Sequence, residues 1–169
     1  MKTPIRKLTL CALLCSCALV LSYFEAQLPS SFIPLPGVKL GLSNIVTLFA
    51  LYSLGAAPAS AILFCRCLLS SAFGGGITAF AFSVCGGAFA ILFMWLAKKS
   101  NLFSIFGVSL AGAAAHGIGQ ILAACIMLNS LSAIFYLPLL LLSSLVTGAV
   151  IAFIAGFLLE RIPEKMYKI

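Results

Sequence analysis

Long apolar runs, separated by short breaks, are the feature that most constrains the fold of this chain. Hydrophobic residues make up 63% of its 169 residues and charged residues only 8%, whereas a soluble domain is nearer half apolar and a quarter charged. The chain therefore has too little polar surface to cover a water-soluble globule. Because the runs are continuous rather than alternating, they predict an all-α integral membrane protein and not a barrel.

Six of these runs approach the roughly 20 residues that a helix needs to cross a bilayer. A turn containing Gly55 and Pro58 separates the second run from the third, and the triple glycine at 74–76 ends the third. We therefore predict a six-helix bundle that forms one membrane domain over residues 1–169, without a soluble domain. The predicted spans are residues 8–24, 40–56, 59–73, 77–97, 102–128 and 133–159, with an outer loop at 25–39.

The basic residues predict the orientation of the bundle. Clusters of Lys and Arg precede the first span and follow the fourth and the sixth. With six spans, all three clusters fall on one side, which the positive-inside rule makes cytoplasmic. Both termini are then cytoplasmic and the 25–39 loop lies outside. The clusters are Lys2, Arg6 and Lys7; Lys98 and Lys99; and Arg161, Lys165 and Lys168.

The outer loop is the longest interruption between the apolar runs. It contains Pro29, Pro34 and Pro36, and it is bracketed by Glu25 and Lys39. A loop that is apolar, stiffened by proline and charged at its ends suits a lid over a pocket. The alternative is a hairpin loop that rests on the bilayer surface.

A few polar residues interrupt the spans, where they normally face a cavity or a partner. His116 and Gln120 are four apart and share a helix face, among small residues that let a helix or a ligand approach closely. Lys39 and Arg66 suit an anionic or carbonyl-bearing ligand, and the amides and the imidazole supply directional hydrogen bonds. We predict an outward-opening substrate pocket; the alternative is hydrogen bonding between helices alone. The candidate substrate-binding residues are Glu25, Lys39, Asn44, Arg66, His116 and Gln120.

Several kinds of site are missing from the sequence. It contains no aspartate, hence no paired-Asp motif for magnesium and diphosphate, and no P-loop for ATP. A single histidine excludes a His-rich metal site, and no serine lies in a nucleophile-elbow pattern. The basic residues form no stripe interleaved with aromatic residues, as a nucleic-acid-binding surface would. We expect no enzyme activity, no cofactor, no metal and no nucleic-acid partner.

The cytoplasmic half of the first span carries small residues four apart, Ala12 and Ser16. Such a face allows close helix docking, either with a partner protein or within the bundle. Six short helices, cytoplasmic termini, a structured first outer loop and this small-residue face together resemble the substrate-binding S component of energy-coupling factor (ECF) transporters. The run PGVKLGLSN at 36–44, with Glu25 ahead of it, resembles the Gx transporter family, which is also labelled heptaprenyl diphosphate synthase component I.

The resemblance covers nearly the whole chain and implies a bacterial plasma-membrane subunit that binds a vitamin-like or precursor small molecule. It implies that the substrate lies near the outer face under the first loop. It also implies that a separate coupling transmembrane subunit, with two ATPases, docks at Ala12 and Ser16, where Ser16 replaces the usual second alanine. The synthase label implies an alternative, a membrane accessory component of a heptaprenyl or polyprenyl diphosphate synthase in quinone side-chain synthesis. Prenyl transfer itself needs acidic diphosphate–metal ligands, and this chain has no aspartate for such a motif.

Overall fold

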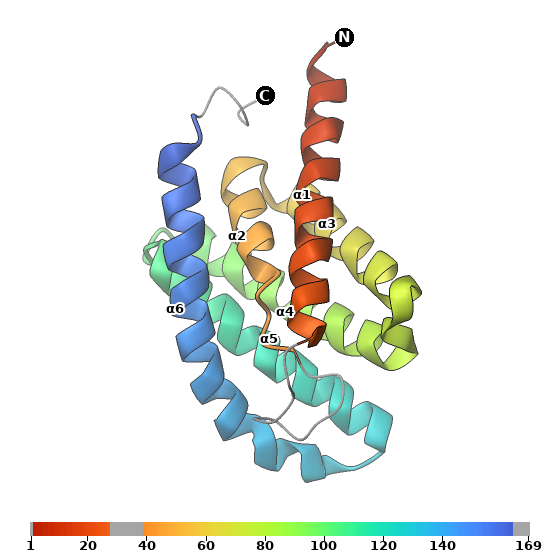
Figure 1. Ribbon diagram of the computed structural model, residues 1–169. Coiled ribbons are helices and arrows are strands. Elements are labelled where there is room, and N and C mark those ends of the chain that lie inside the picture. The colour runs from red at the N-terminus through yellow and green to blue at the C-terminus, as the bar shows by residue number, and fades with distance from the viewer. Residues whose placement is uncertain (1, 28–38, 164–169) are drawn as a thin grey trace.

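Figure 1 shows the computed structural model of the chain, which describes residues 2–27 and 39–163. These residues form six α-helices, with a π-helical turn (η2) before α4 and a 3-10 turn (η3) before α6. The all-helical fold predicted from the apolar runs is confirmed. The elements are α1 (Lys2–Gln27), α2 (Asn44–Ser53), α3 (Ala56–Ser70), η2 (Ser71–Gly75), α4 (Gly76–Ser100), α5 (Ile105–Leu128), η3 (Leu131–Tyr136) and α6 (Leu137–Arg161).

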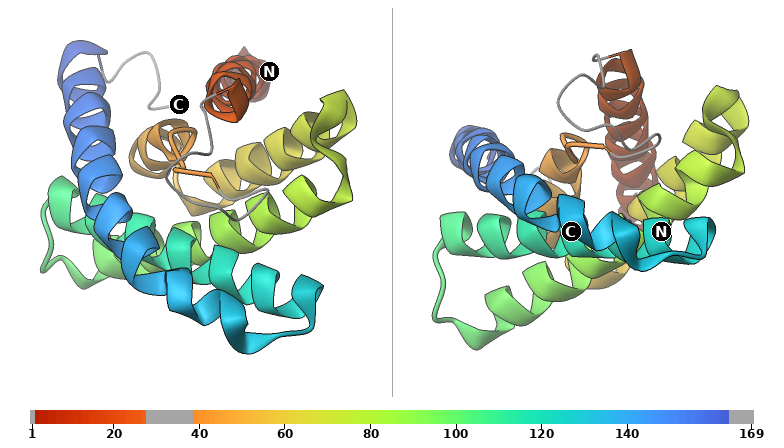
Figure 2. Two further views of the ribbon diagram at one scale, coloured as in Figure 1. Left: turned by 60° about the horizontal axis from the view of Figure 1, so that its bottom comes forward. Right: turned by 90° about the horizontal axis from the view of Figure 1, so that it is seen from below.

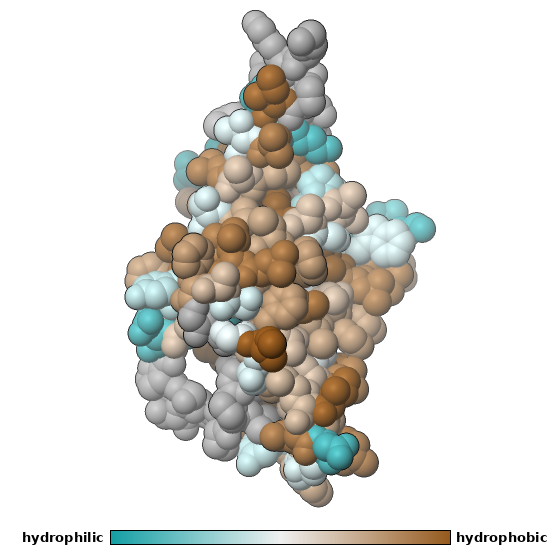
Figure 3. All heavy atoms as spheres, turned by 90° about the vertical axis from the view of Figure 1, so that its right-hand side faces the viewer, coloured by the Kyte–Doolittle hydropathy of each residue, from teal (hydrophilic) through white to brown (hydrophobic). Residues whose placement is uncertain are grey.

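Five of the described segments are long and apolar enough to cross a membrane. They are Ile5–Gln27, Ala56–Phe73, Gly76–Ser100, Ile105–Leu128 and Leu131–Arg161. Figure 3 shows that one face of the molecule is mainly hydrophobic across its centre, with hydrophilic residues at its margins and toward its ends. The structure is therefore that of a multi-pass membrane protein.

The second helix is shorter than the span expected at residues 40–56. Helix α2 has 10 residues, which rise about 15 Å, roughly half of the hydrocarbon thickness of a bilayer. Residues 39–41 are not helical, and Gly41 has a φ of 85°, a left-handed conformation that a helix cannot continue through. Hydropathy alone missed this break because the residues around it are mostly apolar.

The triple glycine reverses the chain between α3 and α4. Its first two glycines end η2, and Gly76 begins α4 with a φ of 66°, which favours glycine over any residue with a side chain. Helices α3 and α4 consequently open away from each other in a V that is visible in Figures 1 and 2. This V forms one side of the bundle, next to α1.

Helix α5 is packed between α4 and α6, and these two contacts are the most extensive in the bundle. A Cβ atom added to Gly119 of α5 would lie 2.6 Å from the backbone oxygen of Cys85 on α4, so the two backbones almost touch. Small residues on α5 are therefore used to bring α4 close.

The start of α1 and the end of α6 lie at the same end of the molecule in Figure 1. The Lys98 ammonium of α4 donates to the backbone oxygen of Leu51 at 2.8 Å, which ties the last turn of α2 to the end of α4. The side of the membrane on which these ends lie stays a prediction. The predicted lid also stays untested, since Pro29, Pro34 and Pro36 lie outside the described residues.

Candidate substrate-binding site

Glu25, in the last turns of α1, holds the entry to α2. Its carboxylate oxygen Oε1 accepts hydrogen bonds from the backbone N–H groups of Gly41 and of Leu42, the latter at 3.3 Å. Successive amides of this kind form a small anion-binding cradle. The side chain is 6% exposed, and its second oxygen, Oε2, has no hydrogen-bond partner among the described residues. One carboxylate oxygen is thus bound to backbone amides, and the other is buried without a partner among the described residues.

Gln120 of α5 binds the backbone of Lys39 from the opposite side. Its Nε2 donates to the Lys39 carbonyl oxygen at 3.1 Å, and its Oε1 accepts from the Lys39 N–H at 3.4 Å. The same Nε2 lies 2.8 Å from Nε2 of His116, one turn away on the shared face predicted from their spacing. Gln120 is fully buried. These contacts hold a chain segment against α5.

Two glycines make room for the His116 ring. A Cβ on Gly86 of α4 would lie 2.8 Å from the ring, and one on Gly41 would lie 3.1 Å from it and 3.0 Å from Nδ2 of Asn44. Asn44 is 1% exposed, and neither atom of its amide has a partner among the described residues. The small residues around His116 therefore admit α4 and the entry of α2 close to the ring.

Arg66 lies on the other side of the cluster, near the middle of α3. It is 2% exposed, and its Nη1 donates to Oγ of Ser22 on α1 at 3.2 Å. Its Nε and Nη2 have no hydrogen-bond partner in the part of the chain that the structure describes. Ser22 was missed by the sequence reasoning. Its position three residues before Glu25, on the same helix face, is the signal that could have identified it.

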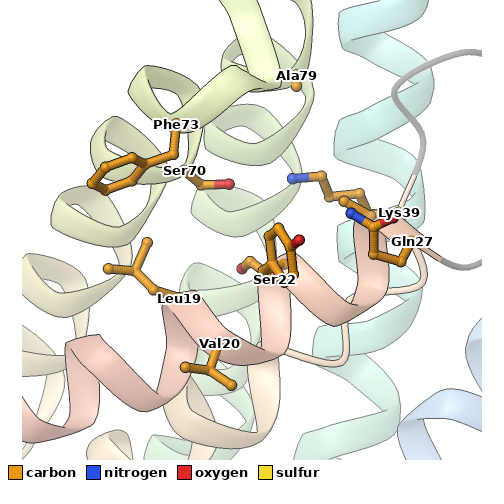
Figure 4. A pocket seen from close by; sticks show the side chains of 10 residues that line it. Leu19, Val20, Ser22, Gln27, Lys39, Ser70, Phe73 and Ala79 are labelled. Atoms are coloured by element: carbon orange, nitrogen blue, oxygen red, sulfur yellow. The ribbon is translucent and has the colours of Figure 1, made fainter.

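A cavity of about 620 Å³ lies between α1, the η2 turn and the start of α4 (Figure 4). Lys39, Ser22 and Ser70 contribute polar groups to its wall, and apolar residues such as Leu19 and Phe73 make up most of the rest. In Figure 4 the Lys39 side chain extends into this space with its ammonium nitrogen toward Ser70. Burial lowers the pKa of Lys39, which the negative charge of Glu25 opposes and the positive charge of Arg66 reinforces.

The structure thus brings together all six candidate residues, in two groups. Asn44, His116 and Gln120 lie where the entry of α2 meets α5, with Glu25 between the groups. Lys39 lines the cavity, and Arg66 donates to Ser22, which also lines it. Whether they bind a substrate stays a prediction. Among the described residues, no three His, Cys, Asp or Glu side chains form a group that could hold a metal ion.

The predicted docking residues lie apart from this cluster. Ala12 and Ser16 are both exposed on α1, and the Ser16 hydroxyl donates to the Ala12 carbonyl oxygen at 3.0 Å. The small-residue face is therefore not covered by any other described part of the bundle.

The model of one protein family matches residues 14–158, which is 145 of the 169 residues and includes the whole polar cluster. The chain belongs to the heptaprenyl diphosphate synthase component I family. No curated protein and no solved structure matches the chain. Membership of the component I family agrees with the resemblance carried by the run at 36–44 and Glu25.

Proposed function

We propose that this chain is the substrate-binding membrane subunit, similar to an S component, of an ECF-type transporter that imports a small vitamin-like or precursor molecule. One observation carries the proposal. Three charged side chains, Glu25, Lys39 and Arg66, lie together within an apolar bundle, and one of them reaches into a ligand-sized cavity. Pockets for small molecules commonly have about this volume and combine apolar walls with few polar groups.

The energetics of this cluster favour a ligand over a purely structural role. A charged group in a membrane protein interior is expensive unless it is paired. Here Oε2 of Glu25 and two guanidinium nitrogens of Arg66 have no partner among the described residues. A bound anion beside Lys39 would offset the excess positive charge of this cluster. The groups that are fully used, such as Gln120, would instead keep the pocket in shape.

ATP-driven transport would need partner proteins, since the sequence has no P-loop with which to hydrolyse ATP. A coupling transmembrane subunit with two ATPases would supply the energy. Ala12 and Ser16 provide a surface for the coupling subunit, because both are exposed on α1 and small residues permit close helix contact. The location implied is the plasma membrane of a bacterium, where the bilayer surrounds the apolar helices.

Affinity purification of the full chain from its native membranes in mild detergent, with mass spectrometry of co-purifying proteins, tests this proposal. We expect a coupling subunit and its ATPases. Ala12→Trp should abolish their recovery, whereas the matched control Leu13→Trp, which also changes an exposed α1 residue, should retain them. Failure of the unmodified chain to recover any such subunit would overturn the transporter proposal.

The family description favours a second candidate, a membrane accessory component of a polyprenyl diphosphate synthase in quinone side-chain synthesis. Because the chain contains no aspartate, the metal and diphosphate chemistry would belong to a catalytic partner. Deletion of the protein distinguishes the two candidates. Loss of quinone side chains with intact small-molecule uptake would replace the transporter by the accessory component.

A further inference from the structure

The cavity beside α1 has walls of two chemical kinds. Leu19 and Val20 of α1 and Phe73 of η2 form an apolar wall, while Lys39 enters from the opposite end with Ser22 and Ser70 nearby (Figure 4). A ligand that contacts the whole cavity must therefore have an apolar body and a polar end.

Three side chains of the cavity wall are also exposed at the surface of the described structure. Val20 is 53% exposed, Tyr23 64% and Phe73 80%, and they lie on two of the segments that can cross a membrane, Ile5–Gln27 and Ala56–Phe73. On such segments, exposed apolar side chains face lipid rather than water. The cavity thus borders the lipid-facing surface of α1 and η2.

The polar end carries an excess of positive charge. Lys39 and Arg66 contribute two positive charges and Glu25 one negative charge, which leaves a net charge of +1 (2 − 1). The Lys39 ammonium makes no hydrogen bond with a described residue, and Arg66 lies directly behind the wall, bound to Ser22. A net charge in an apolar surrounding attracts a counter-ion. A single anionic group next to Lys39 would neutralise the cluster.

We propose that this cavity binds an amphipathic anion, with one carboxylate or phosphate group on Lys39 and an apolar chain along Leu19, Val20 and Phe73. This inference rests on the proposed function, because it names the substrate class of the transporter subunit. The ligand enters sideways from the bilayer between α1 and η2. Polar, water-soluble vitamins without an apolar part are not its substrates.

Calorimetric titration of the purified full chain in phosphatidylcholine nanodiscs tests this inference, with empty nanodiscs as the blank. The probes are hexyl and octyl phosphate, octan-1-ol and inorganic phosphate. We expect octyl phosphate to bind at least tenfold more tightly than either octan-1-ol or inorganic phosphate. Each added methylene should tighten binding about fourfold until the cavity is filled. Equal binding of octan-1-ol and octyl phosphate would overturn the inference.

Matched variants locate the site. Lys39→Gln should weaken octyl phosphate binding at least tenfold and leave octan-1-ol binding unchanged, whereas Lys99→Gln, at an exposed cation away from the cavity, should change neither. Leu19→Trp should weaken both by filling the apolar end, and Leu13→Trp should not. A thermal unfolding curve of each variant verifies folding. Unchanged affinity in folded Lys39→Gln and Leu19→Trp would show that the probe binds elsewhere.

The anion could come from a resident lipid or from a diffusible ligand, and nanodiscs containing phosphatidylglycerol separate these sources. Unchanged octyl phosphate affinity in such discs supports a diffusible substrate. Loss of affinity in proportion to the phosphatidylglycerol content would assign the site to a lipid headgroup and overturn the substrate assignment. Because these titrations need no partner protein, their failure is distinguishable from failure to recover the coupling subunit.

Discussion

The close approach of α4 and α5 at Gly119 leads to a prediction of stability that can be worked from the structure. In Gly119→Ala, the new methyl group would lie 2.6 Å from the Cys85 backbone oxygen and 3.0 Å from Cα of Gly86, so two helix backbones must separate. Overpacking of this kind costs about 1–3 kcal/mol. The higher helix propensity of alanine stabilises the helix by about 1 kcal/mol. The free energy of unfolding should therefore fall by about 0–2 kcal/mol in total.

Gly117→Ala is a matched control on the same helix. Its methyl group would lie 3.7 Å from Cβ of Leu140, an ordinary van der Waals contact, so this variant gains propensity without a clash. Because the propensity contribution is shared, Gly119→Ala should unfold with a free energy about 1–3 kcal/mol below that of Gly117→Ala. Reversible unfolding in mixed detergent micelles, followed by circular dichroism, measures the difference. Equal stability of the two variants would refute the close α4–α5 contact.

Three further predictions use the same unfolding assay. Glu25→Gln should lose about 1–2 kcal/mol, because a neutral oxygen accepts more weakly from two backbone amides; exposed Glu160→Gln is the control and should lose nothing. Lys98→Met should lower the free energy of unfolding by about 1–2 kcal/mol, because the Leu51 carbonyl oxygen at the end of α2 loses its hydrogen bond from the ammonium. A similar loss in Lys99→Met would contradict this. Gly76→Ala should lower the free energy of unfolding by about 1–2 kcal/mol, because a residue with a side chain is strained at a positive φ. An unchanged free energy would show that the turn adjusts without strain.

The helical architecture could be predicted because membrane helices are long, continuous and apolar, which hydropathy detects directly. The length of α2 could not, since Leu40 and Leu42 continue the apolar run although the chain at Gly41 is not helical. At that break the backbone N–H groups of Gly41 and Leu42 donate to Glu25, a residue on another helix. Tertiary contacts of this kind leave no periodic signal in the sequence.

The sequence predicted which polar residues form the cluster but not which partner each of them contacts. Burial cost alone indicated that His116, Gln120 and Arg66 should face one another or a cavity. Spacing could not indicate that Gly86 on α4 accommodates the imidazole, or that the guanidinium donates to Ser22, which lines the cavity. These partners come from distant parts of the chain, and only the packing of α4 and α1 brings them close.

The contact between Gln120 and Lys39 involves only the backbone of Lys39, and its side chain is directed elsewhere. Any residue except proline offers the same N–H and carbonyl groups, so the amide of Gln120 can anchor this position regardless of its identity. In the proposed transporter, attachment to α5 and ligand selection would therefore be separated at a single residue. An acidic or apolar side chain at position 39 would then suit a cationic or neutral molecule, while Gln120 still binds the backbone at this position. Position 39 would therefore be the first residue to change when engineering a new specificity.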